Sequence, residues 1–362
     1  MIDFNPDRWQ RIKEVSTAWY EKKLTRPFMG VAVAERDPGR PQPKAPRLSQ
    51  ATCHDFSFTP EELIDRLDYD LSVYNFYGDA FPFFNMECFG PGVAAAFLGC
   101  DLDNSTGRVW FHPPAPADIT TLKLSYNPNN KYLKRIKDIY RAGMEKWQGR
   151  VIMGLVDMGG IMDILSSFFP GEALFFEMMD HPEDVKRLLS DICELWQVLY
   201  DDLQSVLLPV NPGYTDWSGI YSDKPSYIIQ SDFAYMVGPD TFEEFIFPTI
   251  ADHCDRLDRT VYHLDGEGQL AHLDMLLSLN KLDGIQWVPG DGKPPAVEWP
   301  EVFEKVADAG KLSYVAWSDF DGLAKIGGMV KNPGLLYLPA VYTDADHKED
   351  ALAQLARFRV ER

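Results

Sequence analysis

The sequence lacks the features that mark exported and membrane proteins. No run of about 18 apolar residues occurs, and the N-terminus has no basic region followed by an apolar segment. The five cysteines are scattered along the chain and form no Cys-x-x-Cys pair, a usage typical of reduced thiols. We therefore expect a cytoplasmic protein that is neither secreted nor membrane-spanning.

The chain also lacks a polybasic patch and a glycine-rich nucleotide loop. Its formal net charge is -20, spread without an acidic block, which disfavours nucleic acid and anionic membranes as partners. Neither Gly-x-Gly-x-x-Gly nor the phosphate-binding Gly-x-x-x-x-Gly-Lys-[Ser/Thr] pattern occurs. These absences make nucleic acid an unlikely partner and leave no nucleotide-binding fingerprint.

Short apolar segments do recur, with helical patterns between them. Such alternation predicts a parallel sheet, and about eight repeats without a nucleotide fingerprint favour a closed barrel over a doubly wound sheet. We predict an α/β fold: a single (β/α)8 TIM barrel domain over residues 1–362, with long loops and an N-terminal helical extension over residues 1–25. The expected strands are residues 26–34, 81–86, 151–156, 226–230, 260–264, 284–288, 312–317 and 335–338.

Barrel enzymes carry their chemistry just past the C-terminal ends of the strands. The segment Tyr262-His263-Leu264-Asp265-Gly266 is the best candidate, because side chains two residues apart project to one side of a strand, with their Cα atoms roughly 6.5 Å apart. His263 and Asp265 can both ligate a divalent metal, or Asp265 can orient His263 as a general acid or base. The alternative is structural: Asp265 caps the next helix and His263 is a core residue.

Glu87 is the third catalytic candidate. It follows the expected strand 81–86 beside Cys88, and its carboxylate suits either a third metal ligand, with His263 and Asp265, or a proton carrier. Cys88 is the one cysteine considered as a soft ligand. A loop glutamate beside a buried thiol is an equally weighted alternative.

Several other polar and aromatic residues follow expected strands or lie in comparable loops. Asp157 and Asp232 come after strands and either contact substrate or cap the next helix. The aromatic residues predict a cavity suited to a flat, amphipathic or cationic ligand, although aromatic side chains also fill cores. The candidate substrate contacts are Asp157, Asp232, Tyr235, Trp217, Trp287 and Tyr342.

Four segments, residues 153–160, 230–242, 262–266 and 284–290, give the chain a family resemblance through their order and spacing. The sequence resembles the uroporphyrinogen decarboxylase superfamily, and within it the corrinoid-dependent methyltransferases and their uncharacterised relatives. That resemblance implies a (β/α)8 barrel and a zinc ion held by a His-x-Cys pair and a later cysteine. His263 matches the histidine, but Asp265 stands in place of the cysteine, and the late strand 335–341 has no cysteine. Two alternatives stay open for this altered site: zinc or another divalent metal is bound, with Glu87 or water completing the shell, or no metal is bound.

The function implied by the resemblance is transfer of a methyl group from a small methylated substrate to a corrinoid. The chain has no Asp-x-His-x-x-Gly cobalamin signature, so the corrinoid is expected on a partner protein. Two alternatives stay open. One is a decarboxylase-like lyase, in which Asp232 or Glu87 holds the protonated substrate; the other is a non-catalytic barrel that binds a small molecule or a corrinoid. The sequence also leaves open whether the chain forms a homodimer.

Overall fold

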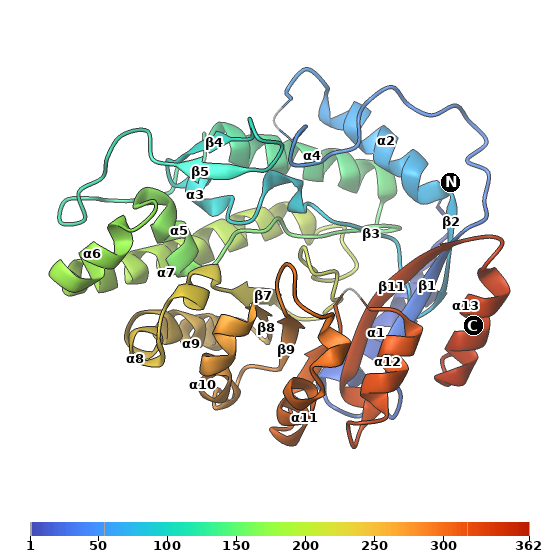
Figure 1. The fold of residues 1–362 in the computed structure, drawn as a ribbon. Helices are drawn as coiled ribbons and strands as arrows, with labels where there is room; N and C mark the ends of the chain where they lie inside the picture. Colours follow the sequence, from blue (N-terminus) through green and yellow to red (C-terminus); the bar gives the residue numbers. More distant parts are fainter. Residues whose placement is uncertain (1, 54, 317, 362) are drawn as a thin grey trace.

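The computed structural model describes residues 2–53, 55–316 and 318–361 and shows a mixed α/β fold (Figure 1). Its centre is a seven-stranded sheet in the order β2-β1-β11-β10-β9-β8-β7. All neighbouring strands in it are parallel except β1 and β2. The strands are β1 (Phe28–Ala34), β2 (Tyr74–Gly78), β7 (Ser226–Gln230), β8 (Arg259–Asp265), β9 (Gly284–Val288), β10 (Leu312–Tyr314) and β11 (Leu336–Asp344).

Two shorter sheets complete the strand inventory of the described residues. β3 (Phe83–Phe84) pairs in parallel with β6 (Ile152–Met153), and β4 (Asp101–Asp103) with β5 (Trp110–His112) forms an antiparallel hairpin. Between β6 and β7 the backbone N–H of Leu155 donates to the Thr215 carbonyl oxygen (2.9 Å), and that of Ile228 donates to Asp216 Oδ2 (2.7 Å). A carboxylate thus takes the place of a strand carbonyl at this junction. The ladders form three separate sheets, so closure of an eight-stranded barrel is not shown.

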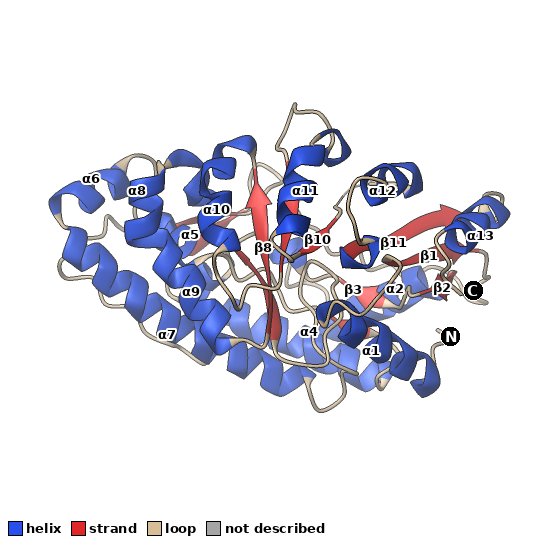
Figure 2. Cartoon of the chain, turned by 90° about the horizontal axis from the view of Figure 1, so that it is seen from below, coloured by secondary structure: helices blue, strands red, loops and turns tan. Residues whose placement is uncertain are grey.

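Helices connect most of the parallel strands and cover them (Figure 2). In Figure 1 the helices α2 (Pro60–Ser72) and α4 (Lys131–Trp147) lie at the top, α8 to α11 lie in the lower half, and α13 lies at the right-hand edge. The remaining helices are α1 (Pro6–Tyr20), α3 (Ala94–Phe97), α5 (Ile161–Phe168), α6 (Ala173–Asp180), α7 (Pro182–Leu207), α8 (Pro239–Thr241), α9 (Phe247–Arg256), α10 (Leu273–Leu277), α11 (Pro300–Asp308), α12 (Phe320–Gly327) and α13 (Lys348–Arg357). None of the helices in the described residues combines the length and apolarity needed to cross a bilayer.

Helix α1 lies within the segment expected to form an N-terminal helical extension, and it is built into the molecule. Asn5 accepts a hydrogen bond from the Arg8 backbone N–H, and Pro6 occupies the first turn, where a missing N–H costs nothing. Trp19 Nε1 donates to the Leu335 carbonyl oxygen (3.2 Å), just before β11 begins. Helix α1 therefore packs against the N-terminal end of that strand, opposite the end where the candidate site lies. The single-domain organisation of residues 1–362 stays a prediction.

Candidate functional site

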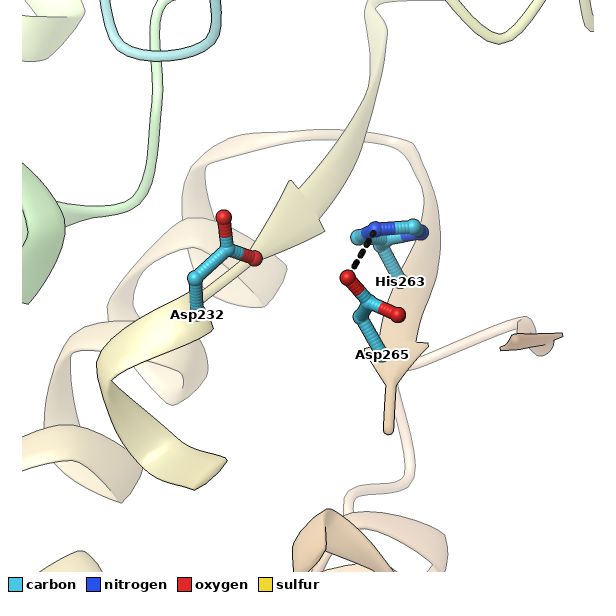
Figure 3. A group of neighbouring side chains, drawn as sticks. All are labelled: Asp232, His263 and Asp265. Carbon is cyan, nitrogen blue, oxygen red and sulfur yellow. Dashed lines mark ion pairs between the residues drawn. The ribbon is translucent and has the colours of Figure 1, made fainter. Parts of the chain in front are cut away.

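Three polar side chains meet at the C-terminal ends of β7 and β8 (Figure 3). Asp232 opens the short helix η2 (Asp232–Met236) directly after β7, while His263 and Asp265 belong to the end of β8. One ligand atom from each residue lies within 4.8 Å of those of the other two. The pair His263 and Asp265 lie on one side of the strand because side chains alternate along it.

Asp232 is held in place by a carboxylate on a neighbouring helix. Asp163, on α5, accepts the backbone N–H of Asp232 (3.0 Å) and of Phe233 (2.9 Å), and so satisfies two donors at the start of η2. This contact requires α5 to begin very close to β7. A Cβ on Gly160 would lie 2.0 Å from the Gln230 carbonyl oxygen, so only glycine fits there.

His263 is buried, and both of its ring nitrogens face oxygen atoms. Nδ1 lies 2.5 Å from Gln286 Oε1, and Nε2 lies 3.9 Å from Asp265 Oδ2. The Trp217 ring meets the imidazole edge-on, with ring centroids 5.3 Å apart. Burial lowers the pKa of His263 although Asp265 and Gln286 act in the opposite direction, so the imidazole is neutral at pH 7.

The neighbouring carboxylates lack cationic partners. Burial, with the Asp265 charge, raises the pKa of Asp232 to about 6, and burial together with Asp232 raises the pKa of Asp163 to about 7. The Asp232 side chain is exposed to solvent and lines a small cavity together with Asp265. No lysine or arginine in the described part of the chain forms an ion pair with Asp163, Asp232 or Asp265. The cluster therefore concentrates negative charge.

The cluster borders two large cavities and a smaller one that is lined by Asp232 and Asp265. The first, which we call the aromatic cavity, has a volume of about 580 Å³, and none of its lining residues is a lysine or arginine. The second, the open cavity, has a volume of about 730 Å³ and reaches both Asp163 and Asp232. Trp217 and Gln286 both contact His263, and both line the aromatic cavity, so they connect this cavity to the cluster. Its other prominent lining residues are Glu87, Phe83, Tyr314, Tyr337 and Tyr342.

The predicted site residues divide into those near the cluster and those elsewhere. Glu87, predicted to complete the metal shell with His263 and Asp265, is not part of the three-residue group, and Asp232 takes that place. Glu87 lies in η1 (Glu87–Phe89), accepts a hydrogen bond from Asn85 Nδ2 (3.0 Å) and lines the aromatic cavity. The reason is topological: η1 follows β3, in a different sheet, whereas β7 is the direct neighbour of β8.

The aromatic candidates differ in how close they lie to the cluster. Trp217 and Tyr342 line the aromatic cavity, and the exposed Tyr235 ring packs against the backbone of Gly266. Trp287 does not reach the cluster: it is buried against Trp299, with ring centroids 5.5 Å apart. The alternation of side chains along β9 turns it away from the side occupied by Gln286.

Asp157 and Cys88 are buried, and neither belongs to the cluster. Asp157 accepts the backbone N–H of Gly159 (3.0 Å), and burial raises its pKa well above the ordinary value. Burial likewise raises the pKa of the Cys88 thiol, which makes it a poor soft ligand.

Gln286 was not among the predicted site residues, whereas its neighbour Trp287 was. In the β8–β9 register, however, Gln286 is directly opposite His263. The available signal was a polar side chain inside an otherwise apolar strand that neighbours the strand of His263 and Asp265.

Comparison with known proteins supports the fold. No protein-family model matches the chain, and no curated protein sequence matches it. Among solved structures, the chain is similar to a methyltransferase from Methanosarcina mazei, with a TM-score of 0.56 and 14% sequence identity over 96% of this chain and 98% of that one. At this identity the likeness shows a shared fold alone, so membership of the uroporphyrinogen decarboxylase superfamily stays a prediction.

Proposed function

We propose that this protein is a cytoplasmic, barrel-type enzyme that transfers a methyl group from a small methylated compound to a corrinoid on a partner protein, assisted by a divalent metal ion. The observation that carries this proposal is the convergence of Asp232, His263 and Asp265 to within 4.8 Å, beside an aromatic cavity. The fold shared with a protein described as a methyltransferase supports the reaction class.

The three side chains fit a divalent metal by their chemistry. A neutral imidazole and two carboxylates are suitable ligands for zinc and for other borderline or hard divalent ions, and the two negative charges balance that of the ion. All five cysteines are buried and none belongs to the cluster, so thiolate ligation is not part of this proposal. When bound, the ion would supply Lewis acidity toward the heteroatom that carries the methyl group.

The reaction needs a proton and a dry, oriented site. Transfer would break the bond between the methyl carbon and its heteroatom, and the electron pair would stay on the heteroatom, which would take up a proton. The new bond to the methyl carbon would use the electron pair of a cobalt(I) corrinoid supplied by the partner protein. Asp163 lies outside the metal shell beside Asp232, and burial with the Asp232 charge raises its pKa to about 7, so it would supply that proton at neutral pH. The aromatic walls beside His263, including Trp217, would hold the substrate and exclude water.

The corrinoid partner would approach through the open cavity. Three large side chains, Trp110, Tyr235 and Met236, are 48–58% exposed and line this cavity or the smaller one that adjoins Asp232 and Asp265. Exposed apolar side chains around a functional cavity favour an interaction site. In this arrangement the methyl donor and its acceptor reach the cluster from two different cavities.

A metal-free lyase is the second candidate, and one observation favours it. The pKa of Asp163 is about 7 and that of Asp232 about 6, so two adjacent carboxyls can exchange protons near neutral pH without any metal. A porphyrinogen with many carboxylates is a poor substrate for such an enzyme, because the aromatic cavity offers no lysine or arginine along its lining.

Metal content separates these functions. Protein purified without chelator is analysed by elemental mass spectrometry as wild type, Asp232→Asn, His263→Ala and Asp265→Asn, with Glu87→Gln as a control carboxylate outside the cluster. We expect near-stoichiometric metal in the wild type and the control, and loss in the other three. Metal-free wild type would contradict metal-assisted transfer.

Activity is measured with free cob(I)alamin as acceptor and a panel of O-, S- and N-methylated compounds, by the absorbance change on cobalt methylation. Failure of every donor, together with metal-free protein, would leave the lyase as the better account.

A further inference from the structure

The side chain of Gln286 lies between His263 and the aromatic cavity. In the β8–β9 register the two residues are direct partners, and His263 Nδ1 lies 2.5 Å from Gln286 Oε1. Gln286 is buried, with 1% of its surface exposed, so water does not compete for this hydrogen bond.

The Gln286 amide lies with its oxygen toward His263 Nδ1. Tyr314 lines the same cavity as Gln286, and its hydroxyl donates its one proton to the Ser218 carbonyl oxygen (2.8 Å). Toward the Gln286 amide that hydroxyl can therefore act only as an acceptor for the NH₂ group. The amide oxygen then faces His263, and an oxygen that only accepts requires a proton on Nδ1.

This chain of donors and acceptors determines what His263 presents to the cluster. A neutral imidazole has one N–H, so a proton on Nδ1 leaves Nε2 with a bare lone pair. Nε2 is the nitrogen that faces Asp265, at 3.9 Å, and lies in the group with Asp232. The lone pair and the carboxylate charges repel one another unless a cation lies between them. The opposite tautomer would instead donate to Asp265, as an acid–base pair requires.

We propose that Gln286 is a positioning residue that holds His263 as the Nδ1–H tautomer, so that Nε2 is presented as a metal ligand. The inference rests on the proposed function in one respect only, namely that the group bound by Nε2 is a metal ion. The tautomer itself is a property of the metal-free protein.

The first test reads the tautomer directly. Metal-free protein with ¹⁵N-labelled histidine is examined by NMR at mildly alkaline pH, and the His263 signals are assigned by their absence in His263→Ala. We expect Nδ1–H in the wild type, a mixture or the Nε2–H form in Gln286→Leu, and a partial change in Tyr314→Phe. Gln286→Glu, which keeps an acceptor oxygen, should restore Nδ1–H.

Gln204→Leu is the matched control, because Gln204 is a buried glutamine on α7 that makes no hydrogen bond to His263. It should leave the His263 signals unchanged. An Nε2–H or doubly protonated His263 in the wild type would refute the inference, as would an unchanged tautomer in both Gln286→Leu and Tyr314→Phe.

The second test measures metal affinity by competition with a chelator, using Zn²⁺ and Co²⁺. Removing such an orienting partner typically lowers affinity about 10- to 100-fold, which is the loss expected for Gln286→Leu, with a smaller loss for Tyr314→Phe. Unchanged affinity in Gln286→Leu would overturn the positioning role. A wild type that binds no metal but shows Nδ1–H would contradict the proposed function and leave the tautomer assignment intact.

Discussion

Folding of the metal-free protein should become more favourable as the pH falls from about 8 to about 5. Burial raises the pKa of Asp163 to about 7 and that of Asp216 to about 6, against an ordinary value of 3.8. The folded state therefore holds protons that the unfolded state releases. For such groups the stabilisation is complete below the unfolded pKa and is lost as the pH rises through the folded pKa.

The magnitude can be worked out for Asp216, which is 4% exposed. The difference between about 6 and 3.8 corresponds to roughly 3 kcal/mol, at about 1.4 kcal/mol for each tenfold change in acidity constant. Carboxylates whose pKa is lowered in the folded state oppose this gain at lower pH, because protonation removes their stabilising contacts. Glu35 is one of them: burial raises its pKa, but hydrogen bonds from Lys348, Tyr77 and Asn75 lower it to about 2. We therefore expect maximal stability near pH 5, at about the acidic end of the usual range.

The assay is urea unfolding followed by tryptophan fluorescence, in the presence of a chelator, at several pH values. Asp232→Asn should be more stable than the wild type at pH about 8 and less dependent on pH, because it removes one carboxylate from a cluster without cations. Glu304→Gln, an exposed acid on α11, should follow the wild type. A wild-type stability that is flat or falls between about pH 7 and 5 would refute the reasoning.

Three further results should distinguish the site from the surrounding core. Gly160→Ala should lose about 1–3 kcal/mol of stability and weaken metal binding, while Gly238→Ala, whose added Cβ meets nothing within 4 Å, should lose far less. In urea unfolding, Trp287→Ala should cost about 3–5 kcal/mol yet keep its metal, whereas Trp217→Ala should lose substrate binding, measured by calorimetry. Met236→Glu should impair methyl transfer to a protein-bound corrinoid but not to free cobalamin; equal loss with both acceptors would contradict a docking role.

Much of the sheet could be predicted from the sequence. The expected strands 226–230 and 284–288 match β7 and β9 residue for residue, because buried parallel strands are short apolar runs bounded by polar residues. Helix α2 ends at Ser72, and β2 follows it. That strand pairs antiparallel with β1, and its mixed sequence carries no alternating pattern, so only tertiary pairing specifies it.

The site was predictable only in part, because sequence position does not give strand order. Asp232, His263 and Asp265 were each placed at a strand end, but their meeting depends on β7 and β8 being direct neighbours. Glu87 was grouped with them on chemistry alone, and its position after β3 separates it from them. Side chains alternate along a strand, so only one of Gln286 and Trp287 can lie on the same side of the sheet as His263. Applied to β9, this alternation would have favoured Gln286.

The contacts of Asp265 and Asp232 argue against the alternative that these residues serve only as helix caps. Asp265 does not cap the helix that follows β8, since η4 (Glu267–His272) begins at Gly266 without a side-chain cap. Asp232 does not cap η2 either, because Asp163 accepts the N–H groups at its start. Asp232 and Asp265 are adjacent carboxylates without cationic partners or capping contacts, and this arrangement lowers the stability of the fold. Gly160 and Asp163 nevertheless hold Asp232 in place. Structure built at a cost to stability is the pattern expected of a binding or catalytic site.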